Sequence, residues 1–145
     1  MSDAFRVCFD VDDTLLTWDR RLRPFAREVI AAVAGGGIEV YLWSGVGRRW
    51  EVAHAYDLRP YILDCFEKPL SNHRARLGEL GVPFVPDYVV DDDEEIVRVF
   101  GGRHVPAPLE PLHEDRALLG VVDDLRDRFG FTLVLPTFDP RGGAR

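Results

Sequence analysis

The chain has 145 residues, of which 46% are hydrophobic and 30% charged, and its formal net charge at pH 7 is −7. Length and composition are typical of one globular domain and leave little room for long disordered segments. No apolar stretch in the sequence approaches the roughly 20 residues of a membrane span. The acidic charge argues against broad, non-specific binding to nucleic acid or to an anionic membrane.

These properties set our expectations for the chain as a whole. We expect one domain at residues 1–140, followed by a short flexible tail at 141–145. The sequence opens without the apolar core of a secretory signal, so we expect a cytoplasmic protein. Cys8 and Cys65 lie in apolar runs without the spacing of a metal site, which predicts two buried, reduced thiols.

The first half of the chain alternates predicted strands with predicted helices. Residues 5–11 alternate apolar and polar side chains, which predicts a strand that ends at a cluster of aspartates. Residues 24–34 predict a helix, because their apolar side chains recur on one face and three glycines follow. The apolar run at 38–43 predicts a second strand, and residues 48–56 predict a second helix.

The second half continues this alternation. It predicts strands at 61–66, 88–93 and 131–135, and helices at 71–80, around 96–100 and at 118–129. Ser71 is a suitable N-cap for the helix at 71–80. Strands that alternate with helices through short links form a mostly parallel sheet with helices on both faces. The sequence therefore predicts an α/β fold, a Rossmann-like three-layer sandwich that binds ligands beyond the carboxyl ends of its strands.

Acidic residues gather where two of these strands end. Asp10, Asp12 and Asp13 lie at the end of the first strand, and Asp91 and Asp92 at the end of the fourth. These ends lie at one edge of a parallel sheet, where several carboxylates are costly unless a cation lies among them. Mg²⁺ is the first expectation, because it binds one or two carboxylates together with phosphate oxygens. The sequence thus indicates a phosphorylated substrate.

Two further residues could complete such a site. Ser44 follows the second apolar run and Lys68 the third, so they could supply a hydroxyl donor and a cation for the phosphate. Taken alone, Ser44 more often marks a helix start, and a lysine before a proline, such as Lys68, is by default a solvated loop residue. Both gain weight from their order along the chain.

Four short segments in this order resemble the motifs of the haloacid dehalogenase superfamily. FDVDDTL at 9–15 is similar to the first motif, Asp-x-Asp-x-Thr after a hydrophobic strand, with Asp13 in place of the usual Gly. YLWSG at 41–45 resembles the second motif, EKP at 67–69 the third and VVDDD at 89–93 the acidic fourth. EKP alone would carry almost no weight, but four segments in order form a joint signal.

The resemblance implies a role for each matching residue. Asp10 would be the nucleophile that forms an aspartyl-phosphate, and Asp12 would protonate the leaving oxygen and then activate water. Asp10, the main-chain carbonyl of Asp12 and an acid of the fourth motif would hold Mg²⁺, and we favour Asp92 over Asp91 as the direct ligand. The implied activity is hydrolysis of phosphate monoesters, because relatives that cleave carbon-halogen bonds lack an acid at the position of Asp12.

Other residues near the motifs are candidates for further roles. Ser44 and Lys68 would complete the catalytic set, and the candidate substrate contacts are Thr14, Gly45, Trp18 and Arg48. Trp18 follows the first motif, where family members carry a flap, although packing explains it equally well. Asp13 faces solvent or holds the next loop, and Asp93 favours a helix N-terminus. The arginines at 20–27 contact a polyanionic substrate or form a solvated face, which is the commoner role of a charge run.

The short spacing between motifs bears on the substrate. Only 33 residues separate Asp10 from Ser44, and a flap, a helix and a strand occupy them, so no sizeable cap domain fits. The resemblance is therefore to capless members, whose sites stay open unless another subunit of an oligomer covers them. An open site favours a large or exposed substrate, such as a protein phosphate or a nucleic-acid end, with a sugar phosphate as a further option. The net charge does not favour nucleic acid.

Two other functions fit parts of the pattern. A phospho-receiver signalling domain shares this kind of fold and clustered acids. It carries its phospho-acceptor after the third strand, however, where this sequence offers only Asp64 inside an apolar run. The other alternative is a binding module that keeps the fold but has lost turnover, and the complete set of motif residues argues against it.

Overall fold

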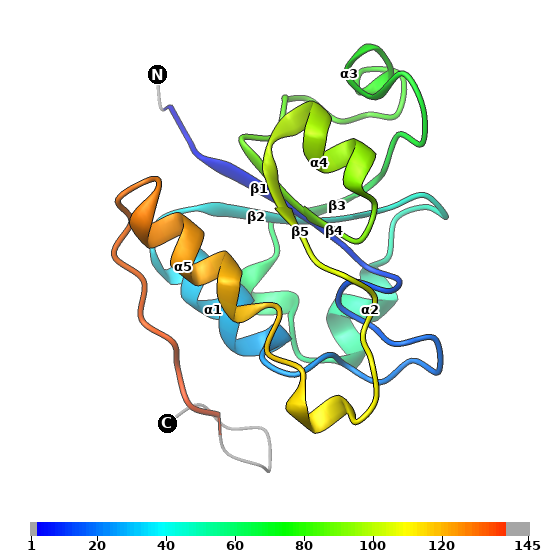
Figure 1. Ribbon diagram of the computed structural model, residues 1–145. Helices are drawn as coiled ribbons and strands as arrows, with labels where there is room; N and C mark the ends of the chain where they lie inside the picture. The colour runs from blue at the N-terminus through cyan, green and yellow to red at the C-terminus, as the bar shows by residue number, and fades with distance from the viewer. Residues whose placement is uncertain (1–2, 139–145) are drawn as a thin grey trace.

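The structure, a computed structural model, describes residues 3–138, so the tail predicted at 141–145 lies outside the described residues. Five parallel strands form one sheet in the order β3-β2-β1-β4-β5 (Figure 1). The strands are β1 (Arg6–Asp10), β2 (Glu39–Ser44), β3 (Asp64–Glu67), β4 (Tyr88–Asp91) and β5 (Gly102–His104). Because β1 is central, its carboxyl end lies between those of β2 and β4.

Helices cover both faces of the sheet. They are α1 (Ala26–Gly35), α2 (Trp50–Ala55), α3 (His73–Arg76), α4 (Glu94–Phe100) and α5 (Leu119–Asp127), with short 3₁₀ turns at Arg59–Tyr61 and Leu112–Glu114. α1, α2 and α5 lie on one side of the sheet and α3 and α4 on the other (Figure 1). The predicted α/β fold with a parallel sheet is confirmed. Among the described helices, none is both long and apolar enough to cross a lipid bilayer.

The residues of β1 explain why the sheet needs both layers. Val7 and Phe9 pack into the core beneath α1 and α5, whereas Cys8 packs into the second core beneath α4, and all three are fully buried. Successive side chains of a strand point to opposite faces, so a strand with two covered faces is apolar throughout. Cys8 and Cys65 are buried free thiols, as predicted.

The prediction of a strand at 131–135 is wrong. This segment does not join the sheet; it runs beside α1 and α5 as an extended chain. Leu133 is buried while Thr132 and Val134 are exposed, so alternate residues face the core, as they do in a strand. The carbonyl of Leu133 accepts a hydrogen bond from Arg126 Nε at 3.2 Å instead of from a neighbouring strand. Period-two burial therefore arises here without strand pairing.

The fifth strand is β5, which the sequence did not predict. Its three residues, Gly102 to His104, are polar or lack a side chain, so they show no apolar pattern. Gly102 is required by close packing, because a Cβ at that position would lie 1.9 Å from the carbonyl oxygen of Val89. This backbone contact allows β5 to pair with β4 at the edge of the sheet, and the types of the residues do not reveal it.

The helix predicted at 71–80 is much shorter than expected. α3 begins at His73, and its N-cap is Asn72 rather than Ser71, with a positive φ of 44° and no side-chain capping bond. Only His73 and Leu77 are buried in this stretch, so a single helical turn suffices to place them. The third strand also begins later than predicted, at Asp64, which moves its end to Glu67 and leaves Lys68 directly after it.

Candidate active site

The carboxyl ends of the strands bring two acids and one lysine into contact. Asp10 ends β1, Asp91 ends β4, and Lys68 follows β3 and reaches across the end of β2. Lys68 Nζ lies 3.1 Å from Asp10 Oδ1 and 3.0 Å from Asp91 Oδ2, and all three side chains are buried. Lys68 is also the only lysine in the sequence. Its compact ammonium has three donors, which suits a position between two carboxylates.

Thr14 joins the first and fourth motifs on the other side of Asp10. Its hydroxyl donates to Asp10 Oδ2 at 2.8 Å and accepts from the backbone N–H of Asp92 at 3.1 Å. Thr14 is fully buried, because the chain turns back under Asp10 immediately after β1. Asp13 allows this turn at a φ of 61°, a left-handed conformation in which Asp is one of the better tolerated residues after Gly. Asp13 itself is exposed.

The buried acids are poorly compensated. Burial raises the pKa of Asp10, and the nearby Asp91 carboxylate raises it further, to about 8, although Lys68 and Thr14 oppose the shift. Burial likewise raises the pKa of Asp91 against the effect of Lys68. For Lys68, burial opposes the charge, but the two carboxylates outweigh it and raise its pKa. One lysine therefore does not balance this site, which favours a further cation.

This imbalance predicts an unusual pH dependence of stability in metal-free protein. The folded chain holds the Asp10 proton up to about pH 8, whereas an unfolded aspartate releases it near 3.8. Because the folded state binds more protons in that interval, the free energy of unfolding should fall as pH rises from about 4 to 8, by a few kcal/mol at most. Urea unfolding in a chelator at pH 5 and pH 8 measures this.

Asp10→Asn should flatten the dependence, and Asp13→Asn, next to the site but exposed, should leave it in place. Equal slopes for Asp10→Asn and the wild type would contradict the assignment of the shifted group.

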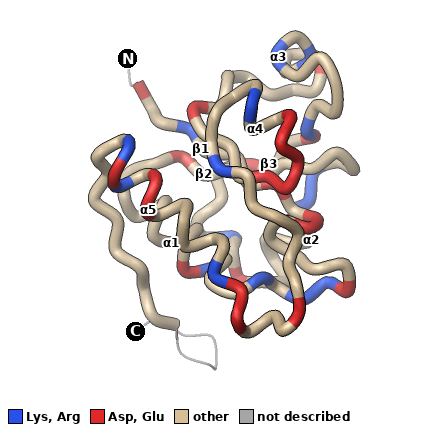
Figure 2. Tube along the Cα trace, viewed as in Figure 1, with Lys and Arg blue, Asp and Glu red and all other residues tan. Residues whose placement is uncertain are grey.

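Three carboxylates lie close enough together that they could hold a cation. One oxygen from each of Asp10, Asp91 and Asp92 lies within 4.8 Å of the other two. Asp91 already accepts hydrogen bonds from Lys68 and from the backbone N–H of Asp93, whereas Asp92 is partly exposed. Figure 2 shows acidic residues continuing from the end of β4 into the start of α4. There Asp93 caps the helix by accepting from Glu95 N, the role expected for it.

The carboxylate of Asp12 lies outside this group and contacts an arginine. Arg49 Nη1 donates to Asp12 Oδ2 at 2.7 Å and lies 3.4 Å from Ser44 Oγ. Glu51 holds the other side of the guanidinium, with Arg49 Nε 2.6 Å from Glu51 Oε2. Sequence reasoning selected Arg48 instead, whose guanidinium lies over the ring of Phe66. Both arginines follow Ser44, and no feature of the sequence tells which one turns inward.

The remaining predicted residues take different positions around the site. Ser44 is buried at the end of β2 and its carbonyl accepts from the backbone N–H of Lys68 at 2.9 Å. Gly45 lies beneath Leu70, because a Cβ there would come within 2.7 Å of that side chain. Trp18 is 87% exposed, so packing does not explain it. Trp18 thus remains free to meet a ligand.

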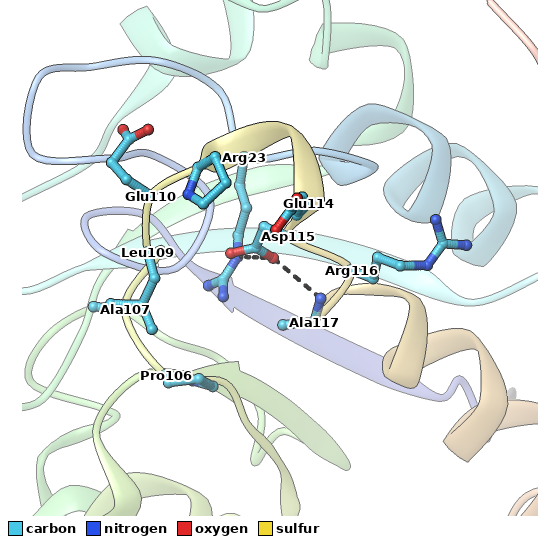
Figure 3. A pocket seen from close by; sticks show the side chains of 10 residues that line it. Arg23, Pro106, Ala107, Leu109, Glu110, Glu114, Asp115, Arg116 and Ala117 are labelled. Atoms are coloured by element: carbon cyan, nitrogen blue, oxygen red, sulfur yellow. Dashed lines mark hydrogen bonds and ion pairs between the residues drawn. The ribbon is translucent and has the colours of Figure 1, made fainter.

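Arg23 departs from the expectation of a solvated or substrate-binding arginine. It is buried, and it donates to Asp115 Oδ1 at 3.0 Å through Nε and to the carbonyl of Thr14 at 3.2 Å through Nη1. Figure 3 shows this ion pair beside a pocket that residues 106–111 and 114–117 line. The pocket has a volume of about 250 Å³. Arg23 therefore supports the turn that carries Thr14, from behind the site.

Comparison with known proteins adds no assignment. No protein-family model matches this chain, and no curated protein matches it. The geometry of the site is therefore what supports a function.

Proposed function

We propose that this protein is a Mg²⁺-dependent phosphatase of the haloacid dehalogenase type, which hydrolyses phosphate monoesters through an aspartyl-phosphate. The observation that carries the proposal is the buried Asp10, held between Lys68 and Thr14 and grouped with Asp91 and Asp92 in a cation-binding arrangement. A buried, oriented carboxylate beside an electropositive position is suited to nucleophilic attack on phosphorus.

The chemistry has two steps. A carboxylate oxygen of Asp10 forms a bond to phosphorus as the bond to the leaving oxygen breaks, and Asp12 gives that oxygen a proton. Asp12 then removes a proton from water, which attacks the phosphorus and releases phosphate and free Asp10. Asp12 is 53% exposed at its side chain and held by Arg49, so it can face both solvent and the leaving group.

The other residues orient and neutralise the phosphoryl group. Lys68 places positive charge beside Asp10, and the Ser44 hydroxyl lies at the end of the neighbouring strand. Asp10 and Asp92 would hold Mg²⁺, which when bound neutralises charge on the transferring group and lowers the pKa of the carboxylates around it. Asp92 suits direct ligation better than Asp91, whose oxygens already accept from Lys68 and Asp93.

The alternative of a phospho-receiver domain is less well supported. Its phospho-acceptor would have to follow the third strand, but Asp64 is the first residue of β3 and so lies at the opposite, amino end of that strand. The Asp64 carboxylate also accepts a hydrogen bond from the backbone of Cys65. Lys68, not an acid, occupies the position after the strand.

Purified protein should release phosphate from para-nitrophenyl phosphate in the presence of Mg²⁺. We expect the rate of phosphate release to fall to background with excess EDTA and to return when Mg²⁺ is restored. Without a bound cation, the carboxylates of Asp10, Asp91 and Asp92 would repel the phosphate of the substrate. Phosphate release assayed in both conditions tests this. Turnover that is unaffected by EDTA would refute the metal dependence, and the absence of turnover on any phosphate monoester would refute the function.

A further inference from the structure

Arg49 lies inside the candidate active site, although the four motifs give it no role. The second motif covers residues 41–45 and the third 67–69, so the segment between them is unassigned. Arg49 is only 8% exposed and lies directly before α2, at the end of the loop that follows β2. Its Nη1 lies 2.7 Å from Asp12 Oδ2 and 3.4 Å from Ser44 Oγ. The guanidinium is therefore placed between the residues after β1 and the end of β2.

The ion pairs of Arg49 do not by themselves explain its burial. The side chains of its partners Asp12 and Glu51 are 53% and 55% exposed, so water can solvate both acids without an arginine. Ion pairs with exposed acids contribute little to stability, whereas removing a guanidinium from water is costly. A buried arginine at the edge of a polar site is typical of phosphate recognition.

The guanidinium of Arg49 keeps donors for a ligand. A guanidinium has five N–H donors in a planar fork. Arg49 donates from Nε to Glu51 Oε2 at 2.6 Å, and Nη1 faces Asp12 and Ser44. Among residues 3–138, the hydrogen bonds of this side chain involve only these two of its three nitrogens. The two donors of Nη2 remain for a ligand, and the fork matches the oxygens of a phosphate.

The charge of the site indicates that a phosphate needs a second basic side chain. The three carboxylates that could hold a cation lie around a single lysine, and Mg²⁺ together with Lys68 would do no more than balance them. A phosphate monoester brings nearly two further negative charges at neutral pH. Arg49 lies beside Ser44, whose backbone carbonyl accepts from the N–H of Lys68 at 2.9 Å. The two basic residues therefore reach the end of β2 from two different loops.

We propose that Arg49 binds the phosphoryl group of the substrate directly, together with Lys68 and the Ser44 hydroxyl. The inference rests on the proposed phosphatase function and adds a substrate-binding residue to it. Arg49 Nη2 donates to a non-bridging oxygen of the phosphate, while Glu51 holds the guanidinium through Nε. The contact is made to the phosphate and not to the leaving group, so it is shared by all monoester substrates.

Orientation of Asp12 alone would give Arg49 a different signature. In the proposed reaction Asp12 acts on the leaving oxygen and on water. A residue that works only through Asp12 therefore changes kcat and leaves the affinity for inorganic phosphate as it was. A direct ligand changes that affinity, because free phosphate carries the same oxygens. The affinity for inorganic phosphate thus separates direct binding from positioning.

Arg49→Gln is the test variant, and Arg98→Gln is its matched control. Both changes remove one positive charge. Arg98 is exposed in the last turn of α4, which leads away from the acids at the end of β4 to the start of β5. Arg49→Gln should fold, because the acids that it leaves without a partner are each more than half exposed. If it does not fold, Arg49→Lys replaces it and should show a smaller loss in the same direction.

We expect Arg49→Gln to weaken the binding of inorganic phosphate in Mg²⁺ about ten- to a hundredfold, the effect of losing a charge-assisted hydrogen bond. Titration followed by ³¹P NMR measures this, and KM for para-nitrophenyl phosphate should rise by a similar factor. Arg98→Gln should match the wild type in both. The loss should persist when Asp12→Asn is present in both proteins compared, because no uncovered Asp12 charge is then left to repel the phosphate. A loss that disappears in this background would overturn direct binding.

The role of Arg49 and the phosphatase function can fail separately. If the wild type hydrolyses phosphate monoesters and Arg49→Gln binds phosphate as tightly as Arg98→Gln, direct binding by Arg49 is refuted and the phosphatase function stands. If the wild type hydrolyses no phosphate monoester but binds inorganic phosphate more tightly than Arg49→Gln does, the phosphatase function fails and the phosphate site at Arg49 stands.

Discussion

Replacing Asp10 with Asn should lower phosphate release by at least about a thousandfold, because the variant lacks the carboxylate oxygen that forms the bond to phosphorus. The structure makes this a clean test. Asn keeps the size of the side chain and can still accept from Thr14, and it removes a buried carboxylate whose pKa is raised to about 8. The variant should therefore stay folded, with a melting temperature in EDTA equal to or above that of the wild type.

A control three residues along the chain sharpens the result. Asp13→Asn changes the same chemical group in the same loop, but Asp13 is exposed and adopts a φ of 61° that Asn tolerates equally well. Because Asn adopts this backbone conformation as readily as Asp and the side chain is exposed, the free energy of unfolding should stay within about 0.5 kcal/mol of the wild type and turnover should be retained. Acid-quench trapping should find covalent phosphate in the wild type and none in Asp10→Asn. Wild-type turnover by Asp10→Asn would show that another group is the nucleophile.

Replacing Lys68 with Met should destabilise the protein strongly as well as inactivate it. The change keeps most of the side-chain length but leaves Asp10 and Asp91 buried without their shared cation. Removing one partner of a buried ion pair typically costs about 3–5 kcal/mol. We expect a loss of that size in urea unfolding at pH 8 in EDTA. The loss should be smaller at pH 5, where Asp10 takes up a proton more readily.

A double variant shows whether charge is the cause. Adding Asp91→Asn to Lys68→Met removes one of the two carboxylates, so much of the lost stability should return although activity does not. The single Asp91→Asn variant completes the cycle. If the double variant is as unstable as the sum of the two single variants, the Lys68 side chain acts through packing and not through its charge.

The sequence predicts where Asp10 and Asp91 lie because each of them has a local signal. Asp10 and Asp91 end apolar runs, and a parallel sheet brings such ends to one edge, so their proximity followed from topology. Lys68 could be predicted as a site residue only from its position along the chain, after Ser44. Arg49 could not be chosen over Arg48, because the choice depends on how the chain turns after β2 and on Glu51.

Part of the fold could likewise be predicted from the sequence. The strand at 131–135 was predicted wrongly and β5 was missed, because strand pairing depends on contacts that the local sequence does not show. β1, β2 and β4 have apolar runs bounded by polar residues, and the structure places them as strands. The segment at 131–135 has the same pattern, yet it packs alternate residues on α1 and α5 without joining the sheet. β5 has no pattern at all, since its place depends on the absence of a side chain at Gly102. The local sequence pattern predicts well which side chains are buried. Strand pairing cannot be predicted in this way, because it depends on backbone segments that are distant in the sequence.

The presence of one lysine among seventeen arginines has a practical consequence. Isotope labelling restricted to lysine introduces a single spectroscopic reporter, and the fold places its ammonium group between Asp10 and Asp91. The signal of that group can be followed by NMR through titration with metal, phosphate or acid without any mutation or assignment strategy. The electrostatic centre of the molecule is thus open to direct observation in the native protein.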